Sequence, residues 1–397
     1  MKRNEKVVPT VPPEDKMRRK PRMDQTRIMA LRAKLLNQGL FNHMAERLLR
    51  YCCMEDRGQN VFLSPMSVLM LLAIAADATA GQTQEEIIRV LGQPNAGKAL
   101  GALQNTLCAE GVLSSASAVC VRKDRAAGLK KEFRELLEQV YGGELFISED
   151  MVQDVNAWVA EKTKGMIREA MPGTMENMML CLINAVAFDD KWKIPYEDHE
   201  VRDGEFRNAD GTVSTVKMMN GVEYDYIDQD RFRGFLKEYR NGFSFLGLLP
   251  KEEGSEALEE AVRLISFFRL LWRPLGKKVY TRMPEFTFNY TRELTPLFEL
   301  MGISDLFRFG ADFSPVLQSD RRLKVGSVLH KAFIDVNRQG TRAAAVTAMW
   351  VEEEGCAPEV EYEEVYLDRP FVFAIIHNRT GHPVFTGIVN RLESREA

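Results

Sequence analysis

The sequence lacks a hydrophobic run long enough to cross a membrane. Its longest uninterrupted apolar segment, Val68–Ala76, has nine residues, whereas a transmembrane helix needs about 20. The six cysteines in 397 residues are too few for a disulfide-stabilised scaffold and include no C-x-x-C pair. Charge is nearly balanced, with 53 Lys and Arg against 57 Asp and Glu, which disfavours general nucleic-acid binding. We therefore expect free and mostly buried thiols, no membrane partner and no nucleic-acid partner.

Common enzyme signatures are missing as well. The sequence contains no G-x-G-x-x-G, G-x-S-x-G or H-E-x-x-H motif, and its five histidines do not have the spacing of metal ligands. The segment from Gly92 to Ala99 fits part of a phosphate-binding loop. However, Ala99 stands where such a loop needs a hydroxyl side chain, and a helical pattern precedes it instead of a strand. We therefore expect a helix–turn–helix junction there, no enzyme activity, no metal and no cofactor.

The N-terminal region has a different composition from the rest. Residues 1–34 contain eleven Lys or Arg against four Asp or Glu, and prolines occupy positions 9, 12, 13 and 21. Residues 1–22 carry charges throughout and have no apolar centre like that of a secretory signal. We expect residues 1–36 to form a basic, flexible extension. Residues 37–397 are expected to form one domain.

The remaining chain shows helical patterns first and mostly strand patterns later. Helical spacing is found at residues 25–53, 66–76, 83–91 and 154–170. Strand-like apolar segments are found at residues 181–188, 213–219, 243–249, 279–288 and 371–377. Ser64-Pro65 gives the second helix a typical capped start. This order predicts an α+β fold, without regular alternation of strands and helices.

The most informative segment is Val336–Ala348, with the sequence VNRQGTRAAAVTA. Every second residue from Thr341 is small or apolar, namely Thr341, Ala343, Ala345, Thr347, Met349 and Val351. The intervening positions are more mixed and carry charges, as at Arg342 and Glu352. A period of two allows one face to be buried in a sheet, although an ordinary edge strand would show the same pattern.

This segment resembles the hinge of the reactive-centre loop of serpins, and further segments agree with that family in the same order. They include NVFLSPMS at 60–67, NAVAFDDKW at 184–192, MPEF at 283–286, LMGISDLFRFGADFS at 300–314 and VLHKAFI at 328–334. The resemblance covers roughly residues 37–391. It implies an α+β serpin fold with about three β-sheets, eight or nine helices and an exposed reactive-centre loop.

The resemblance also implies a serine-type endopeptidase inhibitor that acts as a suicide substrate. A protease cleaves the loop and forms an acyl-enzyme, and the loop then inserts as a new strand of the main sheet. The predicted hinge consists of Gly340, Thr341, Ala343, Ala344 and Ala345, which cost little to bury and favour a working inhibitor. Two alternatives stay open, namely an inhibitor of cysteine proteases and a non-inhibitory serpin.

The resemblance assigns mechanical roles to four other residues. Ser64, Asn184 and His330 are expected to form a buried hydrogen-bonded group under the main sheet, called the shutter. Trp192 is expected to lie at the breach, where the loop enters the sheet. None of these residues is expected to be catalytic.

Two charges at the breach depart from the family pattern. The family usually has an acidic residue at the position of Arg338 and a basic residue at the position of Glu285. We therefore expect either an ion pair with its signs exchanged or two unrelated surface charges.

The residue before the cleaved bond usually follows the first hinge position by about sixteen residues. Counting from Arg338 predicts cleavage between Glu354 and Gly355, and a shifted register would select Val351 or Ala357 instead. Residues 352–368 contain eight Asp or Glu and no Lys or Arg, which disfavours a trypsin-like target. We expect a monomer whose partner is a serine protease that prefers Glu or is elastase-like or subtilisin-like. The resemblance suggests an extracellular protein, with a cytoplasmic one as the alternative.

Overall fold

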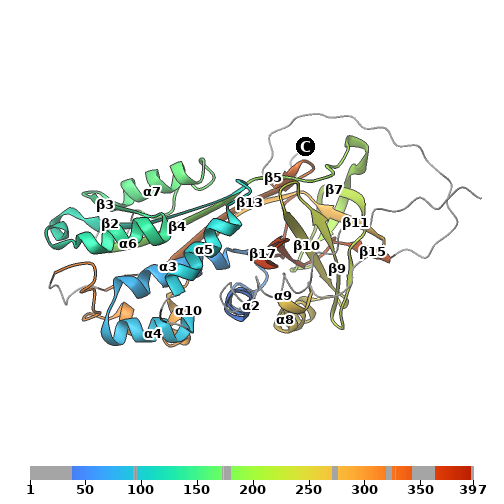
Figure 1. Ribbon diagram of the computed structural model, residues 1–397. Helices are drawn as coiled ribbons and strands as arrows, with labels where there is room; N and C mark the ends of the chain where they lie inside the picture. Colours follow the sequence, from blue (N-terminus) through green and yellow to red (C-terminus); the bar gives the residue numbers. More distant parts are fainter. Residues whose placement is uncertain are drawn as a thin grey trace, which may run out of the picture.

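The computed structural model places most of the chain from residue 38 onward (Figure 1). It describes residues 38–92, 94, 96–171, 173, 180–270, 276–318, 324–326, 328–341 and 363–394. Five predicted site residues lie outside these ranges, namely Ala343, Ala344, Ala345, Glu354 and Gly355. The predicted N-terminal extension lies outside them as well, so its boundary stays a prediction.

Most helices precede the strands, as the sequence predicts. The helices are α2 (Gln38–Glu55), α3 (Pro65–Ala78), α4 (Gly81–Leu91), α5 (Ala96–Leu107), α6 (Lys131–Tyr141), α7 (Met151–Lys162), α8 (Ser255–Leu264), α9 (Phe267–Leu270) and α10 (Thr295–Leu300). The short 3-10 helices are η1 (Lys123–Gly128), η2 (Asp198–Glu200) and η3 (Asp305–Phe307). Helix α3 is apolar on nearly all sides, and it is buried along most of its length.

Two helix boundaries show how local chemistry ends or starts an element. The Ser64 hydroxyl caps α3 by accepting a hydrogen bond from the Ser67 amide at 3.2 Å. The predicted helix 154–170 is wrong at its end, because α7 stops at Lys162. Lys164 and Gly165 have positive φ angles of 51° and 75°, a conformation that ends a right-handed helix.

The strands form a six-stranded sheet and a four-stranded sheet beside it. The first has the order β1-β17-β16-β10-β9-β8, and the second has the order β15-β11-β7-β6. Their bounds are β1 (Val61–Leu63), β6 (Val201–Arg207), β7 (Val213–Glu223), β8 (Tyr226–Asp228), β9 (Phe232–Glu238), β10 (Phe243–Pro250), β11 (Val279–Pro284), β15 (Glu363–Tyr366), β16 (Phe371–His377) and β17 (His382–Val389).

The remaining strands form two further groups, and those of the first group lie between α7 and α3 in Figure 1. One has the order β3-β2-β4, and the other has the order β12-β13-β14-β5. Their bounds are β2 (Leu113–Arg122), β3 (Glu144–Ser148), β4 (Leu180–Phe188), β5 (Asp190–Lys191), β12 (Phe286–Glu293), β13 (Leu329–Asn337) and β14 (Gly340–Thr341). Among the described residues, β4 pairs with β2 alone, and β13 pairs with β12 and β14. The expected count of about three sheets therefore becomes four among the residues described, because the expected main sheet is divided between β4 and β13.

The predicted strand 279–288 is also wrong as a single element. The chain leaves one sheet after Pro284 and enters another at Phe286, with Glu285 between them. The Glu285 amide is hydrogen-bonded to the Lys217 carbonyl at 2.8 Å, outside either ladder. Alternating apolar residues look the same on both sides of such a change, so the pattern could not reveal it.

The free cysteines are distributed through the interior. Cys52, Cys53 and Cys120 are buried, while Cys108 and Cys181 are partly buried. Burial raises the pKa of the Cys52 thiol to about 12, so this thiol is unreactive near neutral pH. In the part of the chain that the structure describes, no helix combines the length and apolar character needed to cross a membrane.

Candidate functional site

The predicted hinge starts inside the sheet. Strand β14 lies between β13 and β5 and is antiparallel to both. Thr341 is directly opposite Val336 on one side and Asp190 on the other. Gly340 has a φ angle of 155°, and a Cβ atom there would lie 2.2 Å from the Asp190 carbonyl oxygen. The close approach of the two backbones therefore requires glycine at this position.

Thr341 points inward, as its alternation with Arg342 predicts. Its side chain is buried, and its Oγ1 atom lies 2.6 Å from the Tyr239 hydroxyl oxygen. One of the two hydroxyl groups donates a hydrogen bond to the other. Thr341 therefore faces the interior of the protein.

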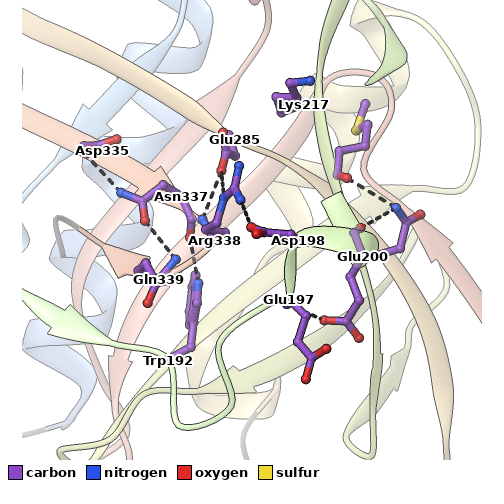
Figure 2. A network of polar contacts seen from close by, with 12 residues as sticks. Trp192, Glu197, Asp198, Glu200, Lys217, Glu285, Asp335, Asn337, Arg338 and Gln339 are labelled. Carbon is purple, nitrogen blue, oxygen red and sulfur yellow. Dashed lines mark hydrogen bonds and ion pairs between the residues drawn. The ribbon is translucent and has the colours of Figure 1, made fainter. Parts of the chain in front are cut away.

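Trp192 lies next to this hinge and is fully buried. Its indole Nε1 donates a hydrogen bond to the Asn337 carbonyl at 2.8 Å (Figure 2), and its amide donates to the Gln339 carbonyl at 2.9 Å. Its ring stacks on Tyr239 with a centroid distance of 4.3 Å. Trp192 thus binds the turn that connects β13 to β14.

The charges of Arg338 and Glu285 meet at the same turn (Figure 2). Arg338 Nε lies 3.7 Å from Glu285 Oε1, and the Arg338 amide also donates to that oxygen at 3.2 Å. Arg338 forms a second ion pair with Asp198, whose carboxylate is exposed. The family's charge pair is therefore present with its signs exchanged, and Asp198 adds a third member that the sequence did not indicate.

A buried ion pair between Lys237 and Glu223 lies close to the Trp192 ring. Lys237 Nζ lies 2.8 Å from Glu223 Oε1, and both side chains are largely buried. The same ammonium group lies 4.2 Å from the ring centroid of Tyr196 and 5.6 Å from that of Trp192. Burial raises the pKa of Glu223, while the Lys237 charge opposes that shift. The pair links β9 to β7, which belong to different sheets.

The three predicted shutter residues are connected through Ser67, whose amide donates to Ser64 Oγ at 3.2 Å and whose hydroxyl donates to the Asn184 carbonyl at 3.3 Å. The Ser64 amide donates to His330 Nε2 at 3.3 Å. The Asn184 side chain donates toward β2, to Ser117 Oγ at 3.0 Å and to the Ala116 carbonyl at 3.3 Å. Ser64 and His330 are thus linked to Asn184 through Ser67 and the Asn184 backbone, while the Asn184 amide side chain points toward β2.

His330 itself is nearly inaccessible to water, with 4% of its surface exposed. Burial lowers the pKa of His330 to about 4, because a charged imidazolium would lose its hydration there. The ring is therefore neutral at physiological pH, which leaves Nε2 free to accept the bond from Ser64.

A cavity of about 100 Å³ separates β4 from β13 below the hinge. It is lined by α3, α7, β4 and the start of β13, and both Asn184 and His330 border it. The Asn184 Oδ1 atom is buried and has no hydrogen-bond partner among the described residues. A buried amide oxygen without a partner is unfavourable, so this position is suited to an incoming donor group.

No group of three or more His, Cys, Asp or Glu side chains within the described ranges is arranged to hold a metal ion. The structure brings together the predicted residues Trp192, Arg338, Glu285, Gly340 and Thr341 around the turn between β13 and β14. It also shows contributors that sequence reasoning missed, namely Asp198, Tyr239, Lys237 and Glu223. No local motif distinguishes these four residues, because they reach the breach from other strands or from η2.

Comparisons with known proteins agree with this arrangement. The family model described as Serpin (serine protease inhibitor) matches residues 40–392. The leukocyte elastase inhibitor of Equus caballus is 30% identical over 370 residues, which cover 87% of this chain and 96% of that protein. This chain therefore belongs to the serpin family, whose members are mostly protease inhibitors and not enzymes.

Solved serpin structures share the fold over nearly all of the chain. The thermophilic serpin tengpin in its native state is 30% identical, with a TM-score of 0.78 and coverage of 90% of this chain and 95% of that chain. Human thyroxine-binding globulin is 25% identical, with a TM-score of 0.79 and coverage of 91% and 100%. The α+β serpin fold predicted from the sequence is confirmed.

Proposed function

We propose that this serpin inhibits serine proteases as a suicide substrate. The observation that carries the proposal is the position of β14, where Thr341 already pairs with the strands on both sides of the divided sheet. The loop would be cleaved by the protease, form an acyl-enzyme and then continue into the space between β4 and β13. Insertion would carry the protease away before the acyl-enzyme is hydrolysed.

The register of β14 supports insertion of the following loop residues. Thr341 pairs with Val336 and Asp190, so antiparallel continuation would bring Ala343 between Ile334 and Phe188. These positions face the buried side of the sheet, where alanine adds little volume. An Ala-rich hinge can therefore enter without displacing the core.

The same register would bring Thr347 between His330 and Asn184. The Thr347 hydroxyl is a hydrogen-bond donor and acceptor, and the Asn184 Oδ1 atom at this level is buried without a partner. Insertion would thus offer a donor to an unsatisfied acceptor. In addition, the nine residues of β4 would gain about ten ladder hydrogen bonds, which stabilise the inserted form by on the order of ten kcal/mol.

The other end of the reactive loop is held by a different sheet. Strand β15 begins at Glu363 and pairs in parallel with β11. Residues 342–362 connect this anchor to Thr341, and the proposed cleavage between Glu354 and Gly355 lies within them. Cleavage would free the Thr341 side to insert while β15 stays in place. Glu354 before the proposed bond favours a protease with a basic specificity pocket. In a shifted register, Val351 or Ala357 would favour a small apolar pocket.

The proposal is tested by mixing the protein with Glu-specific, elastase-like and subtilisin-like serine proteases and with a cysteine protease. The expected result is an SDS-stable complex with a serine protease and release of a C-terminal fragment that begins at Gly355. A complex with the cysteine protease alone would contradict the serine specificity. Cleavage by every protease without a complex, and without a rise in Tm, would indicate a non-inhibitory serpin.

A further inference from the structure

The side chain of Tyr239 is held rigidly beside the hinge. Tyr239 follows β9, and 2% of its surface is exposed. Its ring stacks on Trp192 with an interplanar angle of 16°, and it meets the Phe188 ring edge-on at a centroid distance of 5.1 Å. The Tyr239 amide is also hydrogen-bonded to the Phe243 carbonyl at 2.9 Å. These contacts leave the phenol ring little freedom to rotate, so its hydroxyl group is fixed in position.

The fixed hydroxyl group meets Thr341 inside the sheet. The two oxygens are 2.6 Å apart, and Thr341 is 4% exposed. A buried hydroxyl group needs a hydrogen-bond partner to replace water. The Tyr239 hydroxyl is the partner of the Thr341 hydroxyl. A valine at residue 341 would have nearly the same shape, but it would leave the Tyr239 hydroxyl without this hydrogen bond.

We infer that Tyr239 is the positioning residue that seats the hinge for insertion, which rests on the proposed inhibitory function. Thr341 follows Gly340 in β14 and carries the first side chain of the hinge between β13 and β5, so its position determines the register of the residues that follow. A hydroxyl group fits at residue 341 because it forms a hydrogen bond with the Tyr239 hydroxyl. Trp192 and Phe188 contribute by holding the tyrosine ring.

The inference is tested with Tyr239→Phe, Thr341→Val, their double variant and Thr341→Ser. Tyr141→Phe is the matched control, because the Tyr141 hydroxyl is also buried and donates to Asp77 at 2.6 Å, but it lies on α6 away from the hinge. Three quantities are measured: urea unfolding of the intact protein, the number of inhibitor molecules cleaved per trapped elastase-like protease, and the rise in Tm after loop cleavage.

The expected result is a coupling between residues 239 and 341. Each single variant raises the equilibrium constant for unfolding by a similar factor. In the double variant this constant is about fivefold smaller than the product of the two single effects predicts. Tyr239→Phe and Thr341→Val each at least double the number of molecules consumed per trapped protease. Thr341→Ser behaves like the wild type, and Tyr141→Phe changes stability without changing this ratio.

The outcomes separate this inference from the proposed function. Additive effects in urea, or a Tyr239→Phe ratio equal to that of Tyr141→Phe, overturn the role of Tyr239 and leave the inhibitory mechanism intact. If the wild type traps no protease but still gains Tm on cleavage, the inhibitory proposal fails. In that case, loss of the Tm gain in Tyr239→Phe and Thr341→Val would support the role of Tyr239 in seating the hinge. An unchanged Tm gain in these two variants would overturn that role. If cleavage produces no gain at all, both ideas fail.

Discussion

Placing a negative charge at the inward hinge position is the strongest test of the insertion mechanism. Thr341→Glu puts a carboxylate at a site that is 4% exposed and directly opposite Asp190, which is 3% exposed. Both desolvation and the neighbouring carboxylate oppose ionisation at this position. An arginine there would face Asp190 and be partly compensated, so glutamate is the sharper choice.

The magnitude is limited by protonation of the new side chain. The ordinary pKa of glutamate is about 4.3, and protonating the side chain above this pH costs about 1.4 kcal/mol per pH unit. At pH 7 the total cost is therefore about 4 kcal/mol. If the whole penalty enters the barrier for insertion, the loop inserts about 500-fold more slowly. Deacylation then occurs first, and the inhibitor becomes a substrate. At pH 5 the same calculation leaves about 1 kcal/mol, so trapping should partly return.

The assay is the fraction of an elastase-like protease that remains in an SDS-stable complex, measured at pH 7 and at pH 5. Thr341→Gln is the matched control, because it has the size of glutamate without the charge. Arg342→Glu tests the effect of loop charge alone, because residue 342 alternates with the inward position 341. Full trapping by Thr341→Glu at pH 7 would refute the inward assignment and the insertion mechanism built on it.

Three other sites give separate predictions. Arg338→Glu should destabilise the breach by leaving Glu285 beside a like charge, and Glu285→Lys added to it should restore much of the Tm. Glu223→Gln leaves Lys237 buried without its carboxylate and should cost about 3–5 kcal/mol in urea unfolding. The neutral His330 should make unfolding easier as pH falls from about 6.5 to about 4, by up to about 3 kcal/mol, because the unfolded chain binds the proton first.

Each of these predictions has a control and a contradicting result. Additive losses in the Arg338 and Glu285 variants would mean that the two charges act independently. For Lys237, the double variant Lys237→Met with Glu223→Leu should recover stability, and a further loss would argue against an unpaired buried charge. For His330, the slope of stability against pH should flatten in His330→Gln, and an unchanged slope would assign the dependence to other groups.

Several features could be read from the sequence because they depend on local chemistry. Ser64 and Pro65 define the start of α3, and the apolar run after them predicts its burial. The period of two around Thr341 predicts its inward direction, which the Tyr239 contact bears out. The exchanged charges of Arg338 and Glu285 were also visible once the resemblance aligned them.

Other features depend on contacts between distant segments and could not be read locally. The change of sheet at Glu285 is hidden by continuous alternation. Asn184 hydrogen-bonds toward β2 because the sheet is divided beside it, and no sequence pattern records that division.

The sequence by itself determined the family, the order of the elements and the inward face of the hinge. Motif spacing can be read directly from the sequence, and side-chain periodicity follows from the local geometry of helices and strands. Only the tertiary structure decided what each hinge residue meets. Tyr239 reaches Thr341, and Lys237 reaches Glu223, across 102 and 14 positions of sequence. Both pairs connect β9 or the residue that follows it to a strand of a different sheet, so they form only when the folded chain packs one sheet against another.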